Sequence, residues 1–411
     1  MKDDVFFSFR RCSFSKIPAM IALLLLTAGI SAAKSSVHYV ITDDDEGGVN
    51  TASIYRAGPG PSLTLVKSVE TGGVGVNNGE TATKRVLVLS DGSAQCLYVT
   101  DAGSNDIAAF VIQSSNKKLL EKVGNFKGSK NDVAQLALGL AASDKYVYAS
   151  FYGSGTIATF RLNAGCKLRY VKDIHAGGLN GGHADGMAVH GTMMVVAYAD
   201  GSIQSFNVAA GVPTSNNDRQ LSAGYNACSD DAIPASVDIT QDGHFAIFGD
   251  AGAFVDAEVS DISSGKLKPT TNYGCPNYGL GGGWLTAEAR LSPDESLLFI
   301  SAQSQALGYG QLTAVYFDKT TGALTYGCTG TFRSPDVVWV SGLAVEKTTG
   351  NGGVVYVVID GNGIFIPTYV GFMEISSGGG QCTLNEPGDS PVQDTKAANL
   401  RSIAAYPPRP F

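Results

Sequence analysis

Two acidic side chains, Asp185 and Glu288, are the first candidates for chemistry in this sequence. They stand at matching places in two copies of an internal repeat, and His183 lies two residues before the first of them. Carboxylates that converge on one site can act as general acid and general base when water attacks an ester carbonyl, because that attack requires removal of a proton. We therefore treat Glu288 and Asp185 as catalytic candidates, with His183 assisting. The alternative is that these polar groups only solvate a water-filled channel.

Three further residues could hold a ligand beside those carboxylates. Arg401 is a candidate donor to an oxyanion, a role that backbone N–H groups can also fill. Trp284 and Trp339 could provide aromatic platforms for a cyclic ligand, and they suit loop packing equally well. We assign these three residues to substrate binding.

Two acidic patterns could instead bind a metal ion. His183 and Asp185 supply only two ligands, whereas a zinc site needs at least three from the protein. The acidic run 43–46 is rich in oxygen ligands but lacks the regular alternate spacing of a calcium loop. We expect this run to form a solvated hairpin, and we predict no metal and no cofactor.

A repeat of about 50 residues has to position these side chains. Its clearest copy is Val86 to Phe110, where β-rich segments with alternating apolar residues are separated by turns that contain Gly, Asn and Asp. Degenerate copies begin near five further residues: Leu136, Asp185, Ser236, Glu288 and Gly342. Propeller blades have periods of ~40–50 residues, which leaves room for four strands in each unit. The sequence therefore predicts an all-β, seven-bladed β-propeller of four-stranded antiparallel blades, whose innermost strands line a central channel.

The first blade is incomplete at its own place in the sequence. The strands expected over 37–41, 53–56 and 63–69 make only three. The segment 400–406 can supply the missing innermost strand, because a ring without it would leave unpaired strand edges at both ends. The other blades are expected over six segments: 86–124, 136–175, 184–224, 235–273, 286–332 and 341–392.

The first 33 residues have the pattern of a cleaved signal peptide. A basic leader precedes the apolar stretch Ile17 to Ile30, and the small residues 31–33 form a cleavage site. We expect residues 34–411 to form a single propeller domain that is secreted or periplasmic.

The charge of the mature chain limits its partners. Removal of residues 1–33 takes away four basic and two acidic residues, so the net charge of −8 falls to about −10. An acidic surface argues against nucleic acid and against anionic membranes. We expect a monomer that is not inserted in a membrane and that binds a small molecule in the channel or a protein partner.

Six of the seven cysteines remain once the leader, with its Cys12, is removed. An even number in an oxidising compartment favours disulfides. Cys228, Cys275 and Cys328 fall near the ends of successive fourth strands, so neighbouring blades could be bridged there, and Cys228–Cys275 is the first pairing to consider. Six cysteines allow too many pairings for the sequence to decide, and buried free thiols are the alternative.

Two motifs resemble those of a known family. The segment 97–101, Leu-Tyr-Val-Thr-Asp, with Gly-Ser-Asn at 103–105, is similar to the YVTN-type propeller repeat. Residues 287–294, Ala-Glu-Ala-Arg-Leu-Ser-Pro-Asp, resemble a stretch of the lactonase-like seven-bladed propellers, which include 6-phosphogluconolactonases and fungal muconate-lactonising enzymes. The resemblance covers the mature chain at the level of blade rhythm. It implies the propeller fold, with Glu288 as the family's channel-facing glutamate and His183 as a looser match to a family histidine.

The chain departs from the family pattern at two places, and two hypotheses follow. Where the family often carries Arg-His before an innermost strand, residues 234–236 are Pro-Ala-Ser, and where it has Ser-Asn-Arg, residues 301–303 are Ser-Ala-Gln. Two groups that could hold a carboxylate or phosphate are missing. One hypothesis is a lactonase-like hydrolase that opens a neutral lactone or cyclic ester in the channel. The other is a non-catalytic secreted scaffold that binds a ligand or partner and has lost the active site.

Overall fold

A computed structural model describes most of the chain from residue 38 onward. The described residues are 38–58, 62–76, 84–113, 118–128, 137–222, 233–250, 257–269, 284–304, 309–332, 339–346, 352–360, 368–378, 381–394, 400 and 402–407. Val37–Phe411 forms one compact unit. Every element assigned in the described ranges is a β-strand, and they contain no helix with the length and apolarity to cross a membrane.

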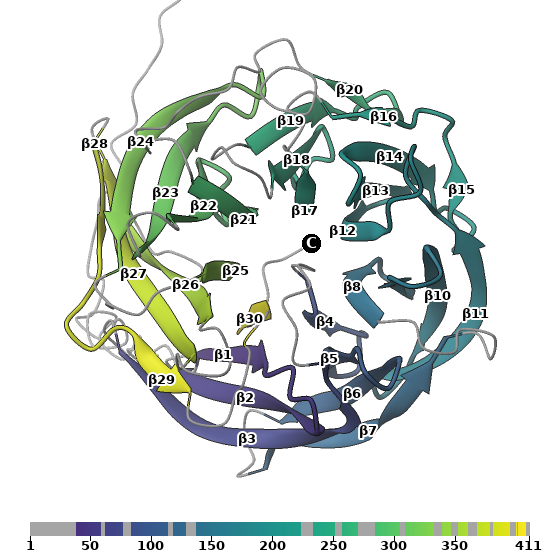
Figure 1. The fold of residues 1–411 in the computed structure, drawn as a ribbon, viewed down its shortest axis with the longest axis horizontal. Coiled ribbons are helices and arrows are strands. Elements are labelled where there is room, and N and C mark those ends of the chain that lie inside the picture. The colour runs from purple at the N-terminus through teal and green to yellow at the C-terminus, as the bar shows by residue number, and fades with distance from the viewer. Residues whose placement is uncertain are drawn as a thin grey trace, which may run out of the picture. The chain divides into compact units, whose positions relative to one another are not determined.

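The strands form seven sheets that are arranged as the blades of a ring (Figure 1). The blades are numbered in chain order. Blade one contains β1 (His38–Asp43), β2 (Val49–Ala57), β3 (Leu63–Val74) and β30 (Ser402–Tyr406). Blade two contains β4 (Val86–Ser90), β5 (Gln95–Asp101), β6 (Asp106–Gln113) and β7 (Leu119–Lys127). Blade three contains β8 (Ala137–Ala142), β9 (Tyr146–Phe151), β10 (Thr156–Asn163) and β11 (Lys167–His175).

The remaining four blades repeat this antiparallel arrangement. Blade four contains β12 (Ala184–His190), β13 (Met193–Tyr198), β14 (Ser202–Asn207), β15 (Thr214–Ser215) and β16 (Gln220–Leu221). Blade five contains β17 (Pro234–Ile239), β18 (Phe245–Asp250), β19 (Ala257–Asp261) and β20 (Lys268–Pro269). Blade six contains β21 (Trp284–Leu291), β22 (Leu297–Ser304), β23 (Tyr309–Phe317) and β24 (Leu324–Thr331). Blade seven contains β25 (Trp339–Val345), β26 (Gly352–Asp360), β27 (Thr368–Gly378), β28 (Gln381–Asn385) and β29 (Val392–Asp394).

The C-terminal strand closes the ring as the sequence predicted. Blade one has the strand order β3-β2-β1-β30, so its innermost strand comes from the far end of the chain. The antiparallel register runs from Tyr39 opposite Tyr406 to Asp43 opposite Ser402. Pairing β1 with β30 removes the strand edge that an open ring would expose. The predicted seven-bladed fold is confirmed.

The apolar core lies between the blades. Seven clusters of buried apolar residues each join two neighbouring blades, and together they pass around the ring. At the closure, Val40 of β1 and Ile403 of β30 pack with Tyr356 and Phe372 of blade seven. Because each blade buries apolar surface on both faces, the ring is stabilised mainly by contacts between blades.

The outermost strand of blade four is broken in two. β15 and β16 both pair with β14, and residues 216–219 interrupt them. At the break, a carboxylate oxygen of Asp218 accepts the N–H of Ser205 at 3.0 Å. This side-chain acceptor replaces the carbonyl that an unbroken strand would provide, so the donor of β14 stays satisfied.

The acidic run 43–46 does not form a solvated hairpin, so that prediction is wrong. Residues 43–45 are fully buried. The carboxylate of Asp44 accepts hydroxyl hydrogen bonds from two threonines and a serine at 2.6–2.9 Å. The guanidinium of Arg85, from blade two, lies 3.0 Å from the carboxylate of Asp45. Burial of a charge is tolerated only with such partners, and all of them except Thr42 come from β2 or from blade two.

In the described part of the chain, two disulfides join neighbouring blades. Cys96 of blade two bonds Cys166 of blade three, and Cys328 of blade six bonds Cys382 of blade seven. The alternative of free thiols is therefore wrong for these four cysteines. The pairing first considered from the sequence, Cys228–Cys275, lies outside the described residues.

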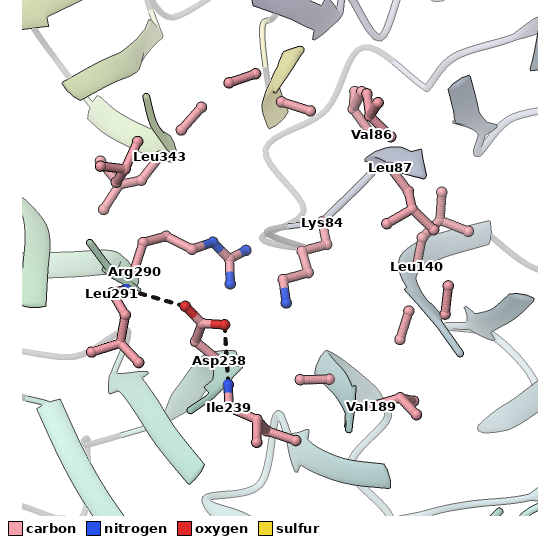
Figure 2. A pocket seen from close by; sticks show the side chains of 18 of the residues that line it. Lys84, Val86, Leu87, Leu140, Val189, Asp238, Ile239, Arg290, Leu291 and Leu343 are labelled. Carbon is pink, nitrogen blue, oxygen red and sulfur yellow. Dashed lines mark hydrogen bonds between the residues drawn. The ribbon is translucent and has the colours of Figure 1, made fainter. Parts of the chain in front are cut away.

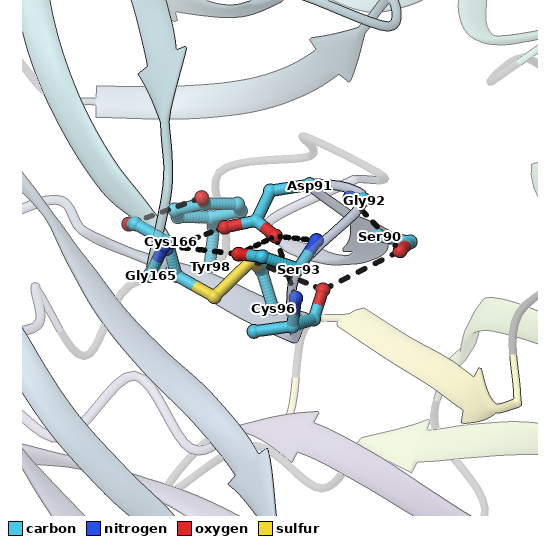
Figure 3. Close-up of a disulfide and its surroundings, with 9 residues drawn as sticks. Ser90, Asp91, Gly92, Ser93, Cys96, Tyr98, Gly165 and Cys166 are labelled. Atoms are coloured by element: carbon cyan, nitrogen blue, oxygen red, sulfur yellow. Dashed lines mark hydrogen bonds between the residues drawn. A yellow bond between two sulfur atoms is a disulfide. The ribbon is translucent and has the colours of Figure 1, made fainter.

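Asp91 holds the turn beside the first of these disulfides (Figure 3). Its carboxylate accepts the backbone N–H of Ala94 at 2.6 Å and that of Cys166 at 2.9 Å. Partial burial opposes ionisation of this carboxyl, but the hydrogen bonds outweigh it and lower the pKa of Asp91 to about 2. The ionised side chain thus links blade two to the turn of blade three that carries Cys166.

Candidate active site

A cavity of about 230 Å³ lies on the axis of the ring, and residues from all seven blades line it (Figure 2). Most of the lining residues come from the second halves of the innermost strands, such as 140–142 of β8 and 343–345 of β25. Ligand pockets usually enclose ~300–1,000 Å³. The volume of this cavity lies below that range, so the cavity suits a small molecule.

Three charged side chains from three blades reach into this cavity. In Figure 2, Lys84 and Arg290 extend toward the middle of the cavity, and Asp238 lies beside them. Lys84 Nζ and Arg290 Nη1 both donate to the backbone carbonyl of Val237, at 2.8 and 3.1 Å. One carbonyl of blade five therefore brings the two cations together, directly before Asp238 in the chain.

Two backbone donors fix the carboxylate of Asp238. Oδ2 accepts the N–H of Leu291 from blade six at 3.1 Å, and Oδ1 accepts the N–H of Ile239 at 3.0 Å. An ionised carboxylate has about four acceptor positions. The two backbone donors therefore hold Asp238 in one orientation.

Glu288 lies behind Arg290 and does not line the cavity. Its side chain is 1% exposed, and it forms an ion pair with the Arg290 guanidinium. Its other oxygen, Oε2, accepts the N–H of Leu343 from blade seven at 2.6 Å. Burial raises the pKa of Glu288, and Arg290 and the Leu343 N–H oppose this rise. The arrangement orients Arg290 and joins blades six and seven.

Irregularities in the innermost strands place the two predicted carboxylates. The register of β21 against β22 shifts between Thr286 and Ala289, next to Glu288. The register of β12 against β13 shifts between Ala184 and Gly186, next to Asp185. Such a bulge re-aims a side chain, and Glu288 is directed toward Leu343 of the next blade. Gly186 allows this approach, because a Cβ there would lie 2.8 Å from the carbonyl oxygen of Ala235.

The structure brings His183 and Asp185 together at a different place. His183 Nε2 lies 2.8 Å from Asp185 Oδ1, and Asp185 is 4% exposed. The ring of His183 packs against that of Tyr152, with 3.7 Å between the ring centroids. Neither His183 nor Asp185 lines the axial cavity, and Glu288 does not line it either.

The described residues offer one group of three potential metal ligands, and it is not a usable one. It consists of Asp91, Cys96 and Cys166, whose cysteines are bonded to each other. His183 and Asp185 have no third ligand of this kind within reach in the described part of the chain.

Three predicted binding residues cannot be assigned to the cavity. Trp284 and Trp339 begin β21 and β25, but their side chains lie outside the described structure. Arg401 lies outside the described residues altogether.

Sequence reasoning missed Lys84, Asp238 and Arg290. Two of them were detectable, because Asp238 and Arg290 are charged residues within the apolar pattern of innermost strands. Lys84 precedes β4 in a segment without a repeat pattern, so only the fold reveals its direction. Together Lys84 and Arg290 supply two cations to the channel, although the family's own cationic positions are missing from this chain.

No protein-family model matches the sequence. The chain matches no curated protein either.

Solved structures show the same fold. A candidate 6-phosphogluconolactonase from Bacteroides fragilis is 14% identical with a TM-score of 0.63, and the match covers 91% of this chain and 99% of that chain. One from Bacteroides uniformis is 12% identical with a TM-score of 0.64, over 90% and 99% of the two chains. The periplasmic gluconolactonase of Pseudomonas aeruginosa is 13% identical with a TM-score of 0.57, over 87% and 98%. The chain is thus similar to lactonase-like seven-bladed propellers in fold, as the sequence motifs implied.

Proposed function

We propose that the protein hydrolyses a small lactone in its axial cavity. The observation that carries this proposal is the convergence of Lys84, Asp238 and Arg290, from three blades, on one small cavity. A carboxylate beside two cations is a set of groups that ester hydrolysis can use, because the reaction needs a base for water and donors for the developing oxyanion. The similar fold of the gluconolactonase from Pseudomonas aeruginosa lends further support.

In this proposal Asp238 moves the proton. Its carboxylate takes a proton from water while the water oxygen bonds to the lactone carbonyl carbon. Arg290 and Lys84 donate hydrogen bonds to the carbonyl oxygen as it becomes negative. The ring C–O bond then breaks, and the protonated Asp238 returns its proton to the leaving oxygen. The product is a hydroxy acid, and the enzyme is regenerated.

Glu288 acts as a positioning residue in this scheme. Its ion pair and its hydrogen bond from Leu343 hold Arg290 at the cavity wall. His183 and Asp185 take no part in the proton transfer, because they do not line the cavity.

We also propose that the protein is exported. Two disulfides support an oxidising compartment, since such bonds are rare in the cytosol. The basic leader and apolar stretch within residues 1–33 provide a signal for export.

A non-catalytic binding protein is the second candidate. It is favoured by the internal partners of both cations, because Lys84 and Arg290 already donate to the Val237 carbonyl. Cations held in this way could recognise a ligand without activating it.

The test measures lactone hydrolysis by the purified mature protein and by Asp238→Asn. We expect Asp238→Asn to lower kcat/KM by about 10²–10⁴-fold, because the amide cannot accept the proton from water. The matched control is Asp261→Asn, in β19 of the same blade and outside the cavity. Unchanged turnover in Asp238→Asn would reject this assignment. Failure to hydrolyse any lactone would favour the binding protein.

A further inference from the structure

The wall of the axial cavity is divided between charged and apolar parts. Of the 21 residues that line it, 16 are Ala, Val, Leu or Ile. Blades one, three and seven contribute only apolar residues, at 403–405, 140–142 and 343–345. The charged residues Lys84 and Arg290 belong to blades two and six, and Asp238 to blade five; the polar residues His190 and Gln241 come from blades four and five. We call the nine residues from blades one, three and seven the apolar arc.

Some backbone donors of the innermost strands are used by neighbouring blades. The N–H of Leu140 donates to the Lys84 carbonyl at 2.8 Å, and that of Val86 donates to the Ser402 hydroxyl at 3.3 Å. The N–H of Leu343 is taken by the Glu288 carboxylate. In the apolar arc, the N–H groups of Leu140 and Leu343 are therefore taken by protein acceptors.

This wall suits a polyhydroxylated ligand poorly. A sugar lactone carries hydroxyl groups on most of its carbons, and each one loses water when it is buried. A hydroxyl that finds no partner in the wall weakens binding. An alkyl group, by contrast, gains from burial against the partly exposed side chains of the arc, which are Val345, Ala404 and Ala405.

We propose that the substrate is a lactone with an alkyl substituent, whose ester group meets Lys84, Asp238 and Arg290 while its alkyl chain lies on the apolar arc. This inference rests on the proposed lactonase function and adds the class of substrate to it. The enzyme therefore discriminates by the apolar part of the substrate, and a sugar lactone is a poor substrate.

The first experiment compares three substrates of the mature protein: γ-butyrolactone, γ-nonalactone and glucono-δ-lactone. We expect kcat/KM for γ-nonalactone to exceed that for γ-butyrolactone by about tenfold or more, since one methylene in an apolar pocket is worth roughly 10-fold or more. We expect glucono-δ-lactone to be hydrolysed more slowly than γ-nonalactone. The opposite order would overturn the inference and leave the lactonase function standing.

A cavity-filling variant locates the alkyl chain. Ala404→Leu places extra methyl groups in the apolar arc, so it should lower kcat/KM for γ-nonalactone at least fivefold, as expected for overpacking. The value for γ-butyrolactone should change by less than twofold. The matched control is Ala210→Leu on an exposed turn, with melting temperatures recorded for both variants. Ala142→Leu, on the opposite side of the arc, replaces Ala404→Leu if that variant does not fold. If the cavity-filling variant lowers kcat/KM by the same factor for γ-nonalactone and γ-butyrolactone, the inference is overturned.

A binding measurement separates this inference from the proposed reaction. The ketone 2-pentylcyclopentanone has no ring oxygen and cannot be hydrolysed, so calorimetry can compare it with cyclopentanone. We expect the pentyl compound to bind at least tenfold more tightly. If no lactone is hydrolysed, the proposed function fails, and equal affinity of the two ketones would overturn the apolar recognition as well.

Discussion

At the scale of single residues, the carboxylate of Glu288 lies behind the guanidinium of Arg290. Both of its oxygens are engaged, one by Arg290 and one by the Leu343 N–H. A residue in this position acts through its neighbour, because it is 1% exposed and does not line the cavity. Arg290 in turn depends on Glu288 for its direction.

Replacing Glu288 by glutamine should therefore affect both stability and activity. The amide can still accept the Leu343 N–H, but it leaves Arg290 without its counter-charge. Removal of one partner of a buried pair costs about 3–5 kcal/mol, and partial exposure of Arg290 reduces this to roughly 2 kcal/mol. Denaturant unfolding measures this loss. Glu374→Gln, on an exposed position of β27, is the control. Equal unfolding free energies for Glu288→Gln and the unsubstituted protein would contradict the structural role.

At the scale of elements, the contact between blades one and two contains an acidic seam. We define it as Asp43, Asp45, Asn50, Arg85 and Asp101. Asn50 Nδ2 donates to both Asp43 and Asp101 at 2.9 Å, and Arg85 pairs with Asp45 at 3.0 Å. Of the three buried carboxyl groups, Asp43 and Asp45 lie 4.0 and 3.0 Å from the one guanidinium. Burial raises the pKa of Asp43 to about 7 and that of Asp101 to about 8.

These shifts predict that the protein loses stability as the pH rises. The pKa of Asp43 and Asp101 is higher in the folded state than the ordinary value of 3.8. At a pH between 3.8 and the raised pKa, each of these carboxyl groups is protonated in the folded state and ionised in the unfolded state. The free energy of unfolding should fall by about 2 kcal/mol or more from pH 5 to pH 8, since each pKa unit is worth about 1.36 kcal/mol. A carboxyl group with a lowered pKa, such as that of Asp91, changes the free energy of unfolding at a lower pH than this range.

The substitution Asp101→Asn tests this origin of the pH dependence. Without one titrating group, the decline in the free energy of unfolding between pH 5 and pH 8 should become shallower. Asp389→Asn, at an exposed position, should leave the slope as it was. A slope that is the same in Asp101→Asn and in the unsubstituted protein would exclude the acidic seam as its source.

At the scale of the whole molecule, the sequence repeat determines the fold, and closure of the ring brings the residues of the candidate site together. The period and the turn residues of the 86–110 copy predict the number of blades, and the three strands of blade one predict the return of 400–406. The period and the turn residues can be read from local sequence, and the missing strand of blade one follows from counting its strands. In contrast, Asp44 is bonded by residues of the neighbouring strand β2, and Glu288 accepts the Leu343 N–H of the next blade.

The candidate site was only partly predictable for the same reason. Glu288, Asp185 and His183 could be selected by residue type and repeat position, but register shifts lie next to both carboxylates and none of the three lines the axial cavity. Lys84 reaches the carbonyl of Val237 across a separation of 153 residues. A contact of this kind is created by ring closure and leaves no local pattern.

Removal of residues 400–411 should abolish cooperative unfolding of the whole ring. It deletes β30, exposes the inner edge of β1 and removes the buried side chains of Leu400 and Ile403. A chain that ends at Pro407 keeps β30 and is the control. Circular dichroism during heating measures the transition. A sharp transition at an unchanged temperature in the shorter chain would contradict the closure.

The most direct test of the account is a crystal structure of the protein with 2-pentylcyclopentanone bound. We expect density for the ketone in the axial cavity, with its oxygen within hydrogen-bonding distance of Arg290 or Lys84 and its pentyl chain against the apolar arc. Density at His183 and Asp185, with an empty axial cavity, would contradict the account.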